Sequence, residues 1–316
     1  MNKNLHTARR NKRDEFYTQL ADIEKELIHY RRHFKDKIVL CNCDDPGVSN
    51  FYFYFSRNFK ILKLKKLVAT CYKNNQFDLF SRNDKEQAIC HEYIETDKTK
   101  EEKEWLLKGD GDFRSDECIE LLKQADIVVT NPPFSLFRKY MAQLMEYEKK
   151  FLIIGAYYAV TYKEIFPLIR DNKVWIGCSL DGRNIWFGIP DYYEKYHKIE
   201  NGMKYAFVAG VVWFTNLPHK KQNEELILTK KYKGNEKDYP KYDNYDAIEI
   251  SKVVDIPKDY NGVMGVPITF LNKYNPEQFE IIGCNSGIDQ DPNRIYGRGS
   301  FLNGKATFKR LFIKRR

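Results

Sequence analysis

The residues best suited to chemistry form the tetrapeptide Asn131-Pro132-Pro133-Phe134, which directly follows the apolar run Ile127 to Thr130. The amino group of a nucleic acid base is a poor nucleophile, because its lone pair is delocalised into the ring. Two acceptors for its hydrogens can draw it toward tetrahedral geometry, and the side-chain oxygen of Asn131 and the carbonyl of Pro132 are suitable. The prolines make the loop rigid, and Phe134 offers a ring face on which an extruded base can stack. The tetrapeptide is therefore a candidate catalytic loop for methylation of a base amino group.

Asn-Pro-Pro can also end a strand without any catalytic role, and the tetrapeptide alone does not separate the two interpretations. Its context favours chemistry, because acidic turns follow two earlier strand positions, at Asp44-Asp45 and at Asp110 to Phe113. Acids in such turns can bind the amino group, ribose or adenine of a nucleotide-like donor. Each acid taken alone can instead be a solvated turn residue or a helix cap.

Alternating helices and strands are expected to position these residues. Apolar side chains recur at three- and four-residue steps from about Glu15 to Phe34, which predicts an amphipathic helix. Further helices are expected after Ser49, within GDGDFRSDECIELLKQ (109–124) and over 136–147, with buried strands at 37–41, 65–72, 127–130 and 151–160. The polar stretch 73–108 reads as a loop or hairpin. The pattern predicts a doubly wound α/β sheet that binds ligands at the carboxyl edge of its strands.

Beyond about Val174 the sequence changes to short β-like runs separated by turn residues and charges. These runs are VWIG, NIWFG, FVAGVVWFT, ELILTKKY, FEIIG, RIYG and FKRLFIKRR. We therefore expect two regions, 1–174 and 175–316, of which the second is smaller and β-rich.

Composition limits the class of protein. The 316 residues carry 53 Lys and Arg against 44 Asp and Glu, a formal charge of +9, which favours a polyanionic partner. Seven cysteines without paired Cys-x-x-Cys ligands favour neither a disulfide framework nor a zinc site, so we expect no metal and a reducing cytoplasm. The polar N-terminus and the lack of a long apolar run argue against secretion and membrane spanning.

Over nearly its whole length the sequence resembles the EcoRI-type family of adenine-specific DNA methyltransferases. The resemblance is carried by KRDEFYTQLADIEKEL, CNCDDPGVSNF, GDGDFRSDECIELL, DIVVTNPPFSLF, TYKEIFPLI, WFTNL, YPKYDNYDAIEI, GVMGVPITFLNKYNPEQFEIIG and the basic C-terminus. It implies a Rossmann-like methyltransferase sheet that uses S-adenosylmethionine, with a smaller, β-rich target-recognition lobe. The implied reaction is direct methyl transfer to N6 of an adenine flipped out of a specific duplex DNA sequence.

The resemblance also assigns residues. It makes Asn131, Pro132, Pro133 and Phe134 catalytic, places Phe16, Tyr17 and Thr18 at the methionine end of the donor, and gives Asp44, Asp45, Asp112 and Phe113 to the rest of the donor. The sequence departs from the usual pattern in three places, one of which is Gly155 to Val160, where two tyrosines stand in place of the more polar sequence expected from the family. The first turn is not glycine-rich, and the second strand ends in Thr70-Cys71-Tyr72 without a carboxylate, so which acid holds the ribose stays open.

The resemblance implies double-stranded DNA as partner, and a restriction endonuclease as a genetic partner only. We expect a monomeric, cytoplasmic enzyme, bacterial or phage-encoded. Clusters of lysine and arginine such as 63–66, 220–221, 230–233 and 309–316 are candidates for phosphate contacts. Two alternatives remain: methylation of RNA adenine or of cytosine N4 in DNA, and a DNA-binding protein without catalysis.

Overall fold

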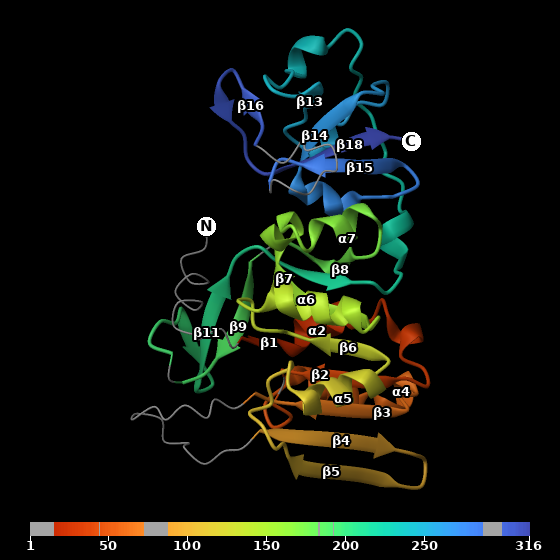
Figure 1. The fold of residues 1–316 in the computed structure, drawn as a ribbon, viewed down its shortest axis with the longest axis vertical. Helices are drawn as coiled ribbons and strands as arrows, with labels where there is room; N and C mark the ends of the chain where they lie inside the picture. Colours follow the sequence, from red (N-terminus) through yellow and green to blue (C-terminus); the bar gives the residue numbers. More distant parts are fainter. Residues whose placement is uncertain (1–15, 44, 73–87, 183, 192, 287–298) are drawn as a thin grey trace. The chain divides into compact units, whose positions relative to one another are not determined.

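The computed structural model describes residues 16–43, 45–72, 88–182, 184–191, 193–286 and 299–316 (Figure 1). The described parts of the chain form two compact units. The first comprises Met1–Ala156 and Arg183–Leu217, and the second comprises Tyr157–Gly182 and Pro218–Arg316. The two units are defined by how the chain packs, which does not test function. The functional division between residues 174 and 175 therefore stays a prediction.

The main sheet of the first unit is mixed. Its strands, in spatial order, are β5 (Lys100–Leu106), β4 (Ile89–Glu95), β3 (Lys66–Thr70), β2 (Ile38–Asn42), β6 (Ile127–Thr130), β7 (Lys150–Ala156) and β12 (Val211–Thr215) (Figure 1). The strands β3, β2, β6 and β7 are parallel, and the strands on either side of them are antiparallel to their neighbours. All four residues of β6 are buried, as expected for a strand covered on both faces. The predicted mixed α/β architecture with a large sheet is confirmed.

The order of the strands reverses between β2 and β6. From β2 the chain continues to β3 on one side, and later returns to β6 on the other side. Ligands of open α/β sheets bind outside the carboxyl ends of the strands at such a reversal. The two carboxyl ends are joined here, because the Thr130 hydroxyl donates a hydrogen bond to the carbonyl of Asn42.

The described part of the first unit also contains five α-helices, of which α4 was not predicted from the sequence. They are α2 (Leu20–Leu27), α3 (Asn50–Arg57), α4 (Phe59–Leu62), α5 (Asp116–Gln124) and α6 (Phe137–Glu146). The helix expected after Ser49 is confirmed, and the Ser49 hydroxyl caps it by accepting from the backbone N–H groups of Phe51 and Tyr52. This cap fixes the turn between β2 and α3.

The long helix expected over 15–34 is wrong in extent. Tyr17–Thr18 is a strand, β1, paired with Phe187 and Gly188 of β9 (Ile185–Ile189) in a small sheet of order β1-β9-β11-β10. Its other strands are β11 (Met203–Val208) and β10 (Lys198–Glu200). Helix α2 begins only at Leu20, and a separate 3-10 turn covers Arg31–His33. Pairing with a distant strand overrides the local helical pattern at Tyr17.

The predicted hairpin within 73–108 is confirmed for its described part, where β4 and β5 pair in antiparallel register. The run ELILTKKY is not a strand, because only an isolated bridge joins Lys230 to Pro257. The run RIYG lies outside the described residues. No helix in the described ranges is long and apolar enough to cross a membrane.

The second unit is built around a sheet of order β13-β14-β18-β15 (Figure 1). Its strands are β13 (Ala247–Glu249), β14 (Val263–Pro267), β18 (Arg310–Arg315) and β15 (Phe279–Cys284). The same unit contains α7 (Phe166–Arg170), β8 (Trp175–Asp181) and the hairpin of β16 (Phe301–Leu302) and β17 (Lys305–Ala306). Buried Tyr242, Tyr245 and Phe312 form one of its apolar clusters.

Candidate active site

Asn131 follows β6 directly, at the reversal of strand order, and its carboxamide is held on one side only. The side-chain nitrogen donates a hydrogen bond to the carbonyl of Phe16 at 2.6 Å. The side-chain oxygen is buried, and no described residue donates to it. A buried acceptor without a donor is costly in a folded protein, and this oxygen is available to accept a hydrogen bond.

The aromatic rings of the loop and of the N-terminal segment lie together. The ring centroids of Phe16 and Phe134 are 5.7 Å apart, and Phe187 of β9 lies 5.5 Å from Phe16 and 6.3 Å from Phe134. Phe16 is buried, whereas Phe134 is partly exposed. The structure thus brings Phe16 next to the loop of Asn131 to Phe134, and the roles of these residues remain predictions.

Two buried hydrogen bonds behind the loop, which we call the lock, were not predicted from the sequence. The Tyr140 hydroxyl of α6 donates to the side-chain oxygen of Asn42, whose backbone carbonyl accepts from Thr130. All three side chains are buried. The lock ties α6 and the ends of β2 and β6 together one residue before Asn131. The spacing of apolar residues in α6 puts Tyr140 on its buried face, but nothing local identifies Asn42 as its partner.

The segment Phe16 to Thr18 also contacts the turn after β2. The Asn50 side chain, at the start of α3, donates to the Thr18 carbonyl at 2.7 Å. The Thr18 hydroxyl is buried and makes no hydrogen bond to the described residues. Tyr17 is partly buried in β1. The N-terminal segment thus bridges the start of α3 and the loop of Asn131.

The acids of the first turn are only partly described. Asp44 lies outside the described residues. The Asp45 side chain accepts from the backbone N–H of Gly47 at 2.9 Å, and its carbonyl accepts from Val48 and Ser49. Asp45 therefore shapes the turn that leads into α3, in addition to any contact with a donor.

Asp112 and Phe113 occupy the turn before α5. The Arg114 guanidinium hydrogen-bonds the Asp112 carboxylate, with Nε at 2.8 Å, and this holds the pKa of Asp112 below its ordinary value. Phe113 is buried 4.9 Å from the ring of Tyr140, and its carbonyl accepts from Gln143. The predicted hydrogen bond, which Asp112 would accept from the adenine of the methyl donor, must therefore use lone pairs of the carboxylate that Arg114 leaves available.

The end of β3 meets the same turn at very short range. Gly111 has a φ of +76°, and a Cβ built on it would lie 2.1 Å from the Cys71 carbonyl oxygen. The Thr70 hydroxyl, one residue earlier, is buried and makes no hydrogen bond to any described residue. The hydroxyls of Thr18 in β1 and Thr70 at the end of β3 are therefore buried groups that can donate to or accept from a nucleoside-like cofactor, whereas the Asn131 oxygen can only accept.

An Asn-Pro-Pro-Phe loop at the strand reversal of a mixed α/β sheet is the arrangement expected of methyltransferases that act on amino groups. The family model described as "Adenine-specific methyltransferase EcoRI" matches residues 4–315. The chain therefore belongs to the EcoRI family of adenine-specific DNA methyltransferases, and it is an enzyme that methylates adenine.

Individual relatives match over nearly the whole chain. The chain is 51% identical to the Type II methyltransferase M.EcoRI of Escherichia coli, covering 99% of this chain and 96% of that protein. It is 40% identical to M.MgeORF184P of Mycoplasma genitalium, covering 98% of each, and 40% identical to M.MpnI of Mycoplasma pneumoniae, covering 99% and 98%. No solved structure is significantly similar to this chain.

Proposed function

We propose that this enzyme transfers a methyl group from S-adenosylmethionine to N6 of an adenine in a specific duplex DNA sequence. The observation that carries the proposal is the Asn131 carboxamide, whose nitrogen is fixed by the Phe16 carbonyl and whose buried oxygen is available as an acceptor. When bound, S-adenosylmethionine supplies a methyl group on a sulfonium, and its carbon–sulfur bond breaks as the nitrogen–carbon bond forms.

The loop residues act on the adenine. Asn131 accepts one hydrogen of the amino group and the Pro132 carbonyl accepts the other, so the lone pair on N6 becomes localised for in-line attack. Phe134 stacks on the flipped base, and Pro133 keeps the loop rigid. The amino group loses one proton to solvent after the attack, so the site requires no dedicated base.

The donor is proposed to lie along the carboxyl ends of β3, β2 and β6, in a Rossmann-like arrangement. Phe16, Tyr17 and Thr18 border its methionine end, and Asp44 or Asp45 binds its amino group or ribose. Asp112 and Phe113 border its adenine. The hydroxyls of Thr18 in β1 and Thr70 at the end of β3 are buried without a hydrogen-bond partner among the described residues, which supports contacts of both with the methyl donor.

The remaining assignments follow the division of the chain. Residues 1–174 carry catalysis and donor binding, and residues 175–316 recognise the target sequence. The enzyme is proposed to act as a cytoplasmic monomer, with a restriction endonuclease as a genetic partner only.

The experiment incubates the protein with labelled S-adenosylmethionine and duplex DNA, and then identifies the methylated nucleoside. N6-methyladenosine in DNA supports the proposal. Label in cytosine, or in RNA alone, rejects it. Confirmed donor binding with no transfer to any nucleic acid favours the alternative of a binding protein.

A further inference from the structure

The most exposed large hydrophobic side chain of the described residues is Phe308, which is 85% exposed. It follows the β16–β17 hairpin and precedes β18 in the second unit. An aromatic ring in water forgoes the stabilisation that burial provides, although single exposed hydrophobic side chains are common on protein surfaces. Phe308 differs from such side chains in its fixed backbone and in the charge of the segment around it.

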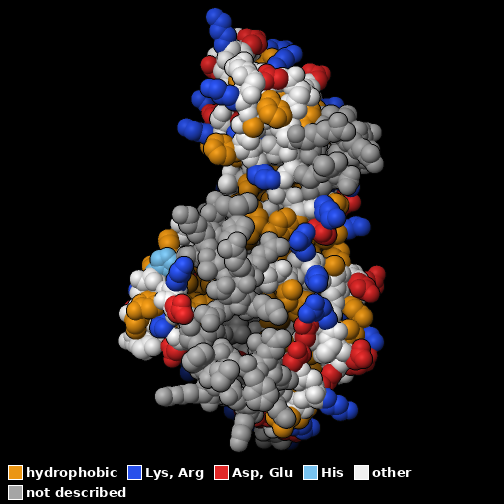
Figure 2. Space-filling view, turned by 60° about the vertical axis from the view of Figure 1, so that its left-hand side comes forward, with side chains coloured by type: hydrophobic (Ala, Val, Ile, Leu, Met, Phe, Trp, Pro, Cys, Tyr) orange, Lys and Arg blue, Asp and Glu red, His pale blue; other side chains and the backbone are white. Residues whose placement is uncertain are grey.

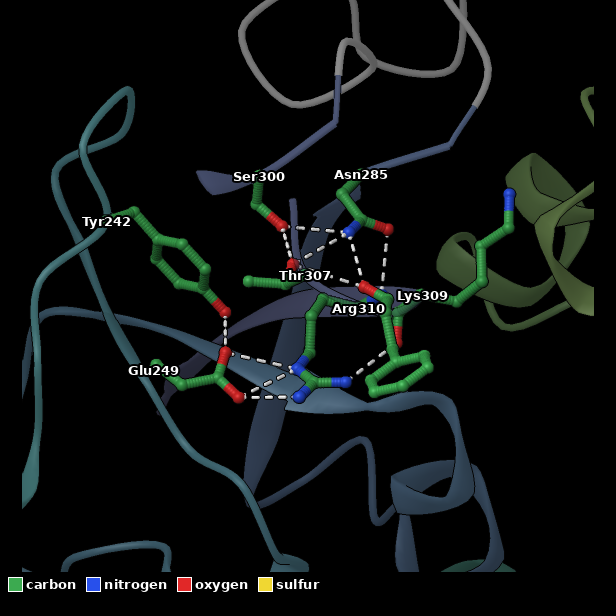
Figure 3. A network of polar contacts seen from close by, with 8 residues as sticks. Tyr242, Glu249, Asn285, Ser300, Thr307, Lys309 and Arg310 are labelled. Carbon is green, nitrogen blue, oxygen red and sulfur yellow. Dashed lines mark hydrogen bonds and ion pairs between the residues drawn. The ribbon is translucent and has the colours of Figure 1, made fainter. Parts of the chain in front are cut away.

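Phe308 is held firmly by its backbone. The Asn285 side chain donates to the Phe308 carbonyl at 2.7 Å and accepts from the N–H of Arg310 at 2.8 Å. The N–H of Thr307, on the other side, donates to the Ser300 carbonyl at 2.8 Å. Figure 3 shows Asn285 between Ser300, Thr307 and Arg310 in this network. The exposed ring thus projects from a backbone fixed on both sides.

The base of this network is buried and charged. Glu249 accepts from the Arg310 guanidinium, with Nη2 at 2.6 Å, and from the Tyr242 hydroxyl (Figure 3). Arg310 and Glu249 are both buried. Arg310 is therefore neutralised inside the fold and is not a phosphate contact, although the sequence places it in a basic cluster.

The hairpin beside Phe308 is also fixed. The Asp243 carboxylate accepts from the N–H groups of Asn303 and Gly304, at 3.0 and 2.7 Å, in the turn between β16 and β17. Lys305 on this hairpin and Lys309 next to Phe308 are both exposed. Residues 299–316 contain no Asp or Glu. The Lys309 ammonium donates a hydrogen bond to the Ser286 hydroxyl. Phe308 therefore lies between exposed lysines in the sequence, in a segment without acids whose backbone is fixed by hydrogen bonds.

The upper part of the view of Figure 2 shows lysine and arginine side chains interspersed with hydrophobic and acidic ones. Cationic side chains beside an exposed ring match the phosphates and the stacked bases of a duplex. A protein surface would instead require a broader apolar patch around the ring.

We propose that Phe308 is a wedge that inserts between stacked base pairs of duplex DNA, while Lys305 and Lys309 contact the flanking phosphates. This inference rests on the proposed function, because it requires a duplex substrate. Insertion unstacks one base step and bends the helix.

The experiment uses the full-length protein and the duplex in which its methylated adenine has been located. The variants are Phe308→Ala, Phe308→Trp and, as a matched control, Ile227→Ala, because Ile227 is 81% exposed in the same unit. Fluorescence of 2-aminopurine at successive positions reports unstacking, and anisotropy reports affinity. Phe308→Ala is expected to bind about tenfold more weakly, the loss typical of one stacking contact, and to give no fluorescence rise outside the flipped base.

Phe308→Trp and Ile227→Ala are expected to match the wild type in both measurements. A plot of the logarithm of affinity against the logarithm of salt concentration is expected to be shallower by about one unit of slope in Lys305→Ala and in Lys309→Ala. Wild-type affinity and unstacking in Phe308→Ala overturn the wedge. Failure of the wild type to methylate any duplex rejects the proposed function itself, so the two failures are distinguishable.

Discussion

The side-chain nitrogen of Asn131 lies 2.6 Å from the carbonyl oxygen of Phe16, which is 115 residues earlier in the chain. The bond has a directional consequence, because a carboxamide that donates on one side presents its oxygen on the other. The N-terminal segment therefore sets the orientation of the residue that we propose to accept a hydrogen of the target amino group.

Replacing Asn131 by alanine tests this role. Asn131→Ala is expected to lower kcat by about 10² to 10³, the usual loss for one polar group that acts at the transition state. Donor affinity is expected to stay close to that of the wild type. Single-turnover methylation and equilibrium donor binding measure the two effects. Gln124→Ala, at the exposed end of α5, serves as a control. Turnover near wild type in Asn131→Ala contradicts the role.

The lock behind the loop gives a second prediction. Tyr140→Phe removes the hydroxyl that donates to Asn42 and leaves a buried acceptor without its partner. The free energy of unfolding is expected to fall by about 1 to 3 kcal/mol. The value of kcat is expected to fall more than donor affinity, because the lock ends one residue before Asn131. Tyr147→Phe, at the end of the same helix, is the control for loss of a hydroxyl. A variant with unchanged stability and turnover would remove any positioning role from Tyr140.

The parts of this site that the sequence predicts share one property: the residues that determine them are neighbours in the chain. Ile127 to Thr130 is an apolar run that two prolines terminate, so both the strand and the loop are legible without tertiary information. Ser49 precedes an aromatic helix and caps it as expected. These features depend on residues that are adjacent in the chain.

The parts that the sequence does not predict depend on distant partners. Tyr17 and Thr18 are a strand only because Phe187 and Gly188 pair with them, about 170 residues later. Arg310 reads as one of several surface cations, yet Glu249, 61 residues earlier, pairs with it in the interior. No local pattern distinguishes a buried arginine from an exposed one.

The buried pair of Glu249 and Arg310 gives a third prediction. Glu249→Gln leaves the Arg310 charge buried without its counter-ion and is expected to lower the free energy of unfolding by about 3 to 5 kcal/mol. The combined change of Glu249→Leu and Arg310→Met removes both charges and is expected to recover most of that loss. Chemical denaturation of the three proteins measures the effect. A Glu249→Gln variant as stable as the wild type would show that the pair is solvated.

Asp112 gives a prediction about pH. The hydrogen bond from Arg114 holds the pKa of Asp112 below 3.8, its ordinary value. The pair therefore contributes stability above about pH 3.8, and the contribution is lost as the pH falls through the lower pKa of the folded state. Arg114 is partly exposed, so we expect Asp112→Asn to cost only about 0.5 to 1 kcal/mol at pH 6.

Denaturation of Asp112→Asn and wild type at several pH values measures this difference, which should shrink below pH 3.8. Asp97→Asn, in the exposed turn between β4 and β5, is the matched control for the loss of a carboxylate. A difference that grows as the pH falls would mean that the carboxylate is destabilised in the folded state, contrary to the geometry.

The last prediction concerns the contact between the end of β3 and the turn before α5. Gly111→Ala would place a methyl group 2.1 Å from the Cys71 carbonyl oxygen and would strain a backbone with a φ of +76°. The two segments must then separate, which displaces Thr70 and Asp112 from their positions at the proposed donor site. Donor affinity is expected to fall at least tenfold, because contacts on both sides of the donor change together. Gly109→Ala, with no atom within 4 Å of its added Cβ, is the matched control and should bind donor as the wild type does. If calorimetry gave equal donor affinity for Gly111→Ala and Gly109→Ala, the donor could not lie against this contact, and Asp112 and Phe113 would lose their proposed role.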